Sequence, residues 1–216
     1  ATHFYPEIAG NTDWADNSTS HGTHVSGTIL GTGTGTVNNR YKGMAPKAQL
    51  VMQSLKNPSI PNAIASPSYD VLFGDAYNDG ARIHSNSWGG GPNGGYSTSS
   101  QLIDTYLWNN KNFTAVFAAG NNSSNITTQG TAKNIITVGA TRNNKGGSYF
   151  DPLVMTSFSC KGPIHDRRIK PDVVAPGQFL QSTYKDSGYV NMSGTSMATP
   201  VVTGSLALIR EYYRTK

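Results

Sequence analysis

The chain has 216 residues, of which 36% are hydrophobic, 13% are charged and 24 are glycine, which fits one compact, secreted domain with a substantial core. Its formal net charge of +5 comes from Lys and Arg that are mostly spread singly, which argues against a nucleic-acid partner. The one cysteine, Cys160, excludes an internal disulfide, and no apolar stretch approaches the roughly 18 residues of a membrane span.

Short apolar runs rich in β-branched residues alternate with helical patterns along the chain. Strands are expected at 48–55, 81–88, 114–121, 134–141 and 172–177, and helices at 68–79, 98–110 and 199–213. This alternation predicts an α/β protein with a mostly parallel sheet that carries helices on both faces. In such sheets the chemistry gathers beyond the carboxyl ends of the strands.

The segment "STSHGTHVSGTILG" (18–31) opens a further predicted helix at His21, with Val25 and Ile29 on its apolar side. His24 follows three residues later near the same face, which raises the possibility of a metal site. Zinc would need a third ligand and an acidic partner in a defined pattern, and none accompanies this pair. The sequence therefore predicts no metal site here.

The segment "VFAAGNNSS" (116–124) is an apolar strand that ends at Gly120 and Asn121. An asparagine at the carboxyl end of a strand can direct its amide donors into a cleft. The alternative is an ordinary turn, because Gly-Asn pairs are common in turns.

The segment "VNMSGTSMATPVVTGSLALI" (190–209) puts small residues directly ahead of an apolar helix. Pro200 is expected within the first turn, where backbone N–H groups have no helical partner, so the helix should begin close to Ser196. A hydroxyl at this positive end could attack a carbonyl and have the oxyanion stabilised by nearby N–H groups. The alternative is that Ser196 only caps the helix.

Together and in this order, these segments resemble the subtilisin-like serine protease family. The matching motifs are HGTHVSGT (21–28), KGMAPKAQL (42–50), SNSWGGG (85–91), AAGN (118–121), ITVGAT (136–141), FSCKGPIHDRRIKPDVVAPG (158–177) and GTSMATP (194–200). Within the family, the chain looks most similar to alkaline subtilases that carry a C-terminal β-domain.

The resemblance implies roles for individual residues. It makes Ser196 the nucleophile, His21 the general base and Asn121 the side-chain donor to the oxyanion. It also implies a primary specificity pocket with two walls. One wall is Ser87, Trp88 and Gly89, and the other is Ala118, Ala119 and Gly120. Small residues on both walls would leave an open slot for a large apolar side chain of the substrate.

The family also has a triad aspartate, in a D-T/S-G motif a few tens of residues before the histidine. Only 20 residues precede His21, so the aspartate and the first core strand are expected upstream of Ala1. Residues 1–216 would then form a single peptidase catalytic domain that is incomplete at its N-terminus. Asp13 and Asp16 lie in a polar loop rather than after an apolar strand, and neither is expected to be the triad acid.

The resemblance implies polypeptide substrates, a propeptide or inhibitor as a further partner, and a secreted or extracellular location. No cofactor is expected to be required. Structural calcium is common in the family, but the loop carboxylates form no recognisable calcium loop. These carboxylates are Asp13, Asp16, Asp70, Asp75 and Asp151.

Two functional hypotheses stay open at this point. The first is a serine endopeptidase, and the second is a non-catalytic relative that binds peptides or proteins through the same cleft. An esterase of the α/β-hydrolase class is disfavoured, because there is no GxSxG motif and His21 precedes Ser196. A D-T/S-G motif upstream of Ala1 would favour the endopeptidase.

Overall fold

The computed structural model describes residues 2–4, 20–55, 67–91, 93–143, 153–185 and 188–216. The helices are α1 (His21–Leu30), α2 (Tyr69–Asn78), α3 (Thr98–Asn109) and α4 (Thr195–Arg214), with short 3₁₀ turns η1 (Val37–Asn39) and η2 (Gln129–Thr131). The strands are β1 (Thr2–Phe4), β2 (Met52–Ser54), β3 (Ile83–Asn86), β4 (Thr114–Ala118), β5 (Ile136–Thr141), β6 (Val173–Pro176), β7 (Leu180–Thr183) and β8 (Tyr189–Met192).

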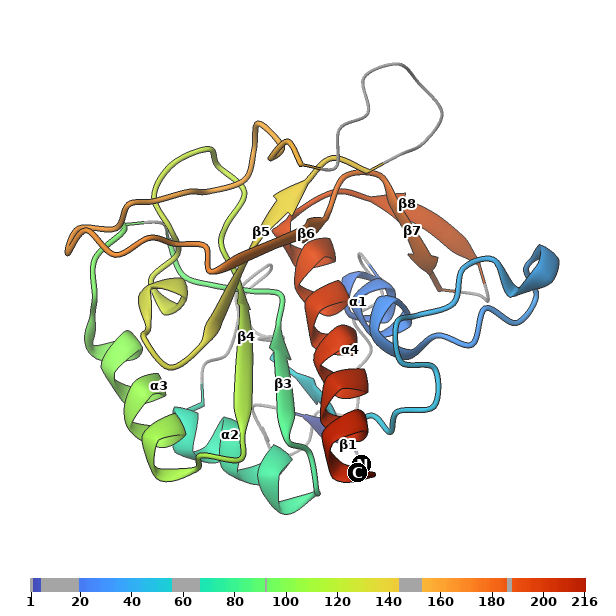
Figure 1. Ribbon diagram of the computed structural model, residues 1–216, viewed down its shortest axis with the longest axis horizontal. Coiled ribbons are helices and arrows are strands. Elements are labelled where there is room, and N and C mark those ends of the chain that lie inside the picture. The colour runs from blue at the N-terminus through green and yellow to red at the C-terminus, as the bar shows by residue number, and fades with distance from the viewer. Residues whose placement is uncertain (1, 5–19, 56–66, 92, 144–152, 186–187) are drawn as a thin grey trace, which may run out of the picture.

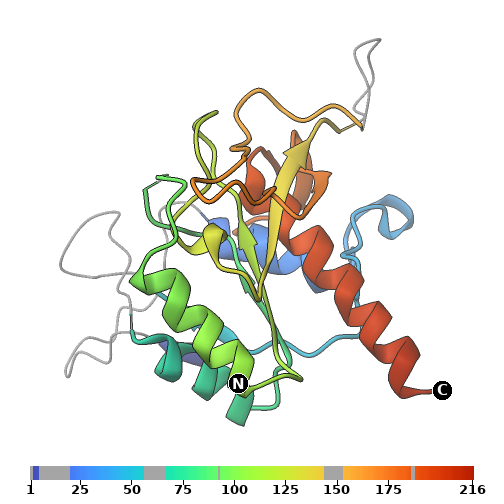
Figure 2. The ribbon, with the colours of Figure 1, turned by 60° about the vertical axis from the view of Figure 1, so that its left-hand side comes forward.

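A four-stranded parallel sheet in the order β3-β4-β5-β6 forms the centre of the molecule. A parallel pair, β1 and β2, and an antiparallel pair, β7 and β8, accompany it. Figures 1 and 2 show α2 and α3 on one face of this sheet and α4 with α1 on the other. The predicted α/β architecture with helices on both faces is confirmed.

Strand β4 shows how the sequence builds the two faces, because successive side chains of a strand point to opposite sides. Ala115 and Phe117 belong to the hydrophobic cluster beneath α2 and α3. Val116 belongs instead to the cluster on the α4 face, together with Val138 and Ala198. All of these side chains are buried, which explains why β4 reads as a continuous apolar run rather than an alternating one.

Each of the five predicted strands contains an observed strand, but the observed strands are shorter, with three to six residues each. The predicted helices match α2 and α3 to within one residue, α4 begins four residues before the predicted 199, and α1 begins at His21 as expected. The pairs β1–β2 and β7–β8 were not predicted as such. Within the part of the chain that the structure describes, no helix combines the length and apolar character needed to cross a bilayer.

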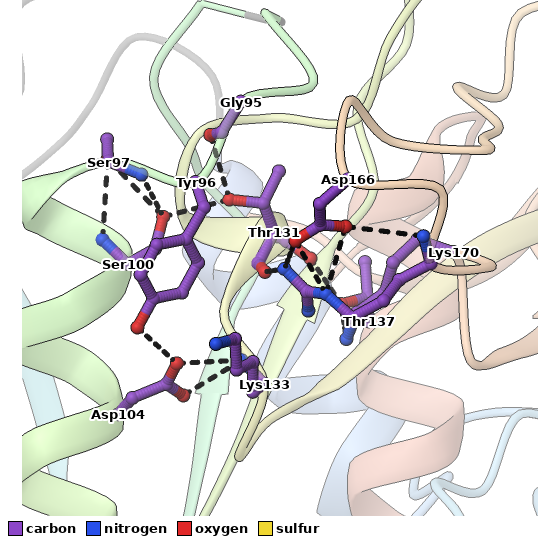
Figure 3. A network of polar contacts seen from close by, with 12 residues as sticks. Gly95, Tyr96, Ser97, Ser100, Asp104, Thr131, Lys133, Thr137, Asp166 and Lys170 are labelled. Atoms are coloured by element: carbon purple, nitrogen blue, oxygen red, sulfur yellow. Dashed lines mark hydrogen bonds and ion pairs between the residues drawn. The ribbon is translucent and has the colours of Figure 1, made fainter.

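Helix α3 is anchored to the sheet by the carboxylate of Asp104 (Figure 3). This carboxylate accepts hydrogen bonds from the backbone N–H of Lys133 at 2.8 and 2.9 Å and of Asn134 at 2.7 Å. The Tyr96 hydroxyl donates to it at 2.8 Å. Burial and this carboxylate together raise the pKa of Tyr96 to about 12. The network fixes the start of β5, and with it the neighbouring end of β4.

Candidate active site

Three segments that are distant in sequence meet at the carboxyl end of the parallel sheet. Strand β3 leads into Ser87, β4 leads into Gly120 and Asn121, and α4 begins at Thr195. Direct hydrogen bonds join each of the first two segments to the start of α4. The structure therefore brings the predicted nucleophile and the predicted oxyanion donor to one edge of the sheet, as expected for an α/β fold.

Ser196 is the second residue of α4, and its side chain is half-buried. Its hydroxyl donates to the backbone carbonyl of Ser87, with an Oγ–O distance of 3.1 Å. In return, the Ser87 hydroxyl donates to the carbonyl of Ser196 at 2.8 Å. These two bonds fix the start of the helix against the end of β3 and define where the Ser196 side chain lies.

Pro200 lies in the second turn of α4 rather than in the first, so the expected position was wrong by one turn. Without an N–H, Pro200 cannot bond the carbonyl four residues earlier, which belongs to Ser196. That carbonyl instead accepts the Ser87 hydroxyl. The side chain of Ser87, directly after β3, thus replaces the missing helical hydrogen bond, which is why the proline is tolerated inside the helix.

The orientation of the Asn121 side chain is fixed by Thr195. The amide oxygen Oδ1 accepts a hydrogen bond from the Thr195 backbone N–H at 2.7 Å and another from its hydroxyl at 2.9 Å. A Cβ atom built on Gly194 would lie 3.3 Å from Nδ2, so this nitrogen lies beside the residue two positions before Ser196. Because Oδ1 holds both of these bonds, Nδ2 is the part of the amide that can donate to a ligand.

Thr195 is a supporting residue that the sequence did not predict. Its side chain is fully buried, and its hydroxyl accepts the Gly120 backbone N–H at 3.2 Å while donating to Asn121. One hydroxyl therefore connects the end of β4 to the first turn of α4. The only signal in the sequence is its place directly before Ser196, which any helix cap would also explain.

His21 is the first residue of α1 and is half-buried. Ser20, immediately before it, has a left-handed backbone with φ of 51°. Helix α1 packs against α4, so the histidine and Ser196 stand at the starts of two helices in contact. The structure thus places the predicted base on an element adjoining the predicted nucleophile.

His24 has a structural role. It is completely buried, and its Nε2 lies 2.9 Å from the carbonyl oxygen of Leu180 and 3.2 Å from that of Val190, on β7 and β8. Burial lowers its pKa, and the charge of nearby His21 adds to this effect. A neutral His24 thus joins α1 to the β7–β8 pair. Among the described residues, no three His, Cys, Asp or Glu side chains gather as a metal would require.

The first predicted pocket wall follows directly from β3. Trp88 is half-buried and packs edge-to-face on Phe117, with ring centroids 5.7 Å apart. Gly89 is exposed and closely approaches Thr127, whose Cβ would lie 3.0 Å from a Cβ at this glycine. A larger residue here would crowd Thr127, so glycine favours the close approach of the segment after β3 to the segment after β4.

The second predicted wall contributes mainly backbone. Ala118 and Ala119 are buried, and Ala119 belongs to a small core cluster with Cys160. Gly120 has φ of 114°, and a Cβ there would lie 2.8 Å from the Cys160 sulfur. Cys160 in turn donates its backbone N–H to the Gly120 carbonyl at 2.9 Å. The cysteine therefore supports the strand end that carries Asn121.

The described residues thus define an α/β protein with a serine-centred site at the carboxyl edge of its parallel sheet. Residues 4–215 match the model of the subtilase family, Peptidase_S8. Thermitase from Thermoactinomyces vulgaris is 31% identical over 95% of this chain and 70% of its own length. The serine protease AprX from Bacillus subtilis (strain 168) is 31% identical over 88% of this chain and 48% of its own length.

More distant similarities agree with these. The serine protease/ABC transporter B family protein tagD from Dictyostelium discoideum is 28% identical over 94% of this chain, which spans only 16% of that protein. The structure of the patellamide maturation protease PatA covers all of this chain and 73% of its own, with a TM-score of 0.72 and 24% identity, which supports the fold. The chain belongs to the subtilase family of serine proteases.

Proposed function

We propose that this chain is the catalytic part of a serine endopeptidase that acts through Ser196, His21 and Asn121. The observation that carries this proposal is the anchoring of the Asn121 amide. Thr195 holds Oδ1 by two hydrogen bonds, which leaves Nδ2 as the donor at the edge where Ser196 lies. Two hydrogen bonds that fix the orientation of an exposed side-chain amide are expected where that orientation matters for binding a ligand.

In the proposed reaction, Ser196 Oγ attacks the carbonyl carbon of the scissile peptide while His21 takes the hydroxyl proton. The hydroxyl donates to the Ser87 carbonyl in the structure, and it gives up this bond when its proton passes to His21. His21 then returns the proton to the leaving amine, and a water molecule hydrolyses the acyl-enzyme by the same route. The carboxylate that would orient His21 stays a prediction from the family resemblance, and Asp13 and Asp16 lie outside the described residues.

The oxyanion of the tetrahedral intermediate would accept hydrogen bonds from two donors. One is Asn121 Nδ2, and the other is the Ser196 backbone N–H, which lies in the first turn of α4 and has no acceptor within the helix. The positive end of the helix adds to this stabilisation. Donors fixed before the reaction are effective because they need not reorganise as charge develops.

We further propose that Ser87 to Gly89 and Ala118 to Gly120 line the slot for the substrate side chain, with a preference for large apolar residues. Glycine and alanine occupy four of these six positions, which keeps the slot open. Polypeptide substrates follow from the family, and we propose a secreted or extracellular location together with a propeptide or inhibitor as a further partner.

The test is hydrolysis of a peptide with a large apolar residue before the scissile bond, by the chain extended upstream to include the predicted triad aspartate and by two variants of that extended chain. Ser196→Ala should abolish cleavage. Ser205→Ala removes a hydroxyl from the same helix that, among the described residues, bonds only the Val201 carbonyl, at 2.9 Å, and this variant should cleave normally. A folded chain that binds the peptide but leaves it intact would contradict the proposal and identify the non-catalytic alternative.

A further inference from the structure

A second candidate site lies at the opposite end of the molecule from Ser196. The groove has a volume of about 770 Å³ and is formed by the beginnings of β3 and β4 and the last turns of α4. Ile83 and Thr114, the first residues of these strands, both line it. Arg210 is fourteen positions after Ser196 in α4, which is about 21 Å along the axis of the helix. Figure 1 shows these ends of β3 and α4 far from the carboxyl edge of the sheet.

The lining combines apolar and cationic side chains. Leu206, Ile209 and Tyr213 recur along one side of α4, and Ile209 and Tyr213 are 52% and 76% exposed. Three arginines line the same groove, and no Asp or Glu is among the residues that line it. A helix face of this kind, both apolar and positively charged, suits a partner that carries apolar groups beside negative ones.

The guanidinium groups are close enough to influence one another. Burial lowers the pKa of Arg210, and the charges of Arg214 and Arg82 lower it further. Like charges held together in this way are unfavourable unless a negative group joins them. The groove therefore carries positive charge that no carboxylate among its lining residues balances.

One donor in the groove is buried without an acceptor. The Nε–H of Arg210 has no hydrogen-bond partner in the part of the chain that the structure describes. Leaving a buried donor of a charged group unsatisfied is unfavourable, because the group loses its hydrogen bonds to water without gaining others. Because Nε itself has almost no accessible surface, an incoming carboxylate would bond the terminal N–H groups of the same guanidinium.

Arg82 is held rigidly in position on the other side of the groove. Its Nη1 donates to the carbonyl of Tyr77 at 2.8 Å and to that of Ala81 at 2.7 Å. Its guanidinium also lies over the Tyr77 ring, 3.8 Å from the centroid. Because Arg82 is fixed before any ligand arrives, little side-chain entropy is lost on binding.

We propose that this groove binds an acidic polypeptide segment of a partner protein, in which apolar side chains alternate with carboxylates. The apolar groups would cover Ile209 and Tyr213, and a carboxylate would bond Arg210 between Arg82 and Arg214. A nucleic-acid backbone fits less well, because it offers phosphates but nothing to cover the apolar half of the lining.

The test measures binding of a fluorescein-labelled peptide of alternating leucine and glutamate, blocked at both ends, to the full chain. Ser196→Ala is used throughout so that the peptide stays intact. Arg210→Gln should weaken binding by about tenfold, the loss of one charged hydrogen bond. Arg40→Gln, which removes the same charge near Tyr41, should change it by less than about twofold.

Two further arms distinguish the proposal from general attraction to a positive protein. A peptide with glutamine in place of glutamate should bind at least about tenfold more weakly, and raised salt should weaken the glutamate peptide. Arg214→Gln, at an exposed position, provides a second groove variant whose folding is not at risk. Equal effects of Arg210→Gln, Arg214→Gln and Arg40→Gln would overturn the proposal. So would no binding of the acidic peptide, or equal binding of a single-stranded oligonucleotide.

Discussion

Replacing Thr195 by valine tests the most specific feature of the proposed oxyanion site. Valine keeps the shape of the fully buried side chain but removes the hydroxyl that accepts Gly120 N–H and donates to Asn121 Oδ1, over 3.2 and 2.9 Å. Two hydrogen bonds at about 0.5–1.5 kcal/mol each predict a loss of about 1–3 kcal/mol of stability. Asn121 keeps its bond to the Thr195 N–H at 2.7 Å, so the amide is loosened rather than released.

For catalysis we therefore expect Thr195→Val to lower kcat by about tenfold, or about 1.4 kcal/mol in barrier height. The matched control is Thr199→Val, one turn later on α4. Thr199 is also fully buried, but within the described part of the chain its hydroxyl bonds only the Thr195 carbonyl, at 2.8 Å. Urea unfolding and steady-state peptide hydrolysis are measured for both variants. If kcat were the same in Thr195→Val and Thr199→Val, the proposed anchoring of the oxyanion donor would be refuted.

Three further predictions concern the same region and the sheet behind it. Asn121→Ala should lower kcat by about 10²–10³-fold with little change in KM. This range is already known for an oxyanion donor of subtilisin, a member of this family. A raised KM with unchanged kcat would contradict this role for Asn121. Gly120→Ala should lower the free energy of unfolding in urea by about 1–3 kcal/mol, because Gly120 has φ of 114° and the new methyl would lie 2.8 Å from the Cys160 sulfur. The control Gly74→Ala, in open space on α2, should be neutral or stabilising. Burial lowers the pKa of His84 from 6.5 to about 4. Between these two pH values mainly the unfolded chain binds the proton, so the free energy of unfolding should be highest above pH 6.5 and fall by about 3 kcal/mol as the pH drops toward 4. His84→Gln should flatten this dependence, and an unchanged slope would refute it.

The central fold could be predicted because its signals are local. Apolar runs such as residues 114–121 and 134–141 are long enough to indicate buried parallel strands, and helices between them fix the α/β class. The β7–β8 pair could not be predicted in this way. Its strands, "LQST" and "YVNM", are short and largely polar, and they are held partly by His24, more than 150 residues away in sequence.

The candidate site shows the same division. His21, Asn121 and Ser196 could be proposed because each lies in a distinctive local motif at the start of a helix or the end of a strand. Thr195 could not, since its importance depends on a contact with Asn121, 74 positions earlier in the chain. Hydrogen bonds of this kind depend on distances that only the folded chain defines.

The proposed function is tested most directly by identifying the residue that reacts with a fluorophosphonate probe. The probe phosphonylates an activated serine with loss of fluoride. The folded chain, extended upstream to include the predicted triad aspartate, should therefore be labelled once, and peptide mapping should place the label on Ser196. Ser196→Ala should prevent labelling, while Ser205→Ala should not. Absence of labelling in the folded chain, or a label on any other serine, would contradict the assignment of Ser196 as the nucleophile.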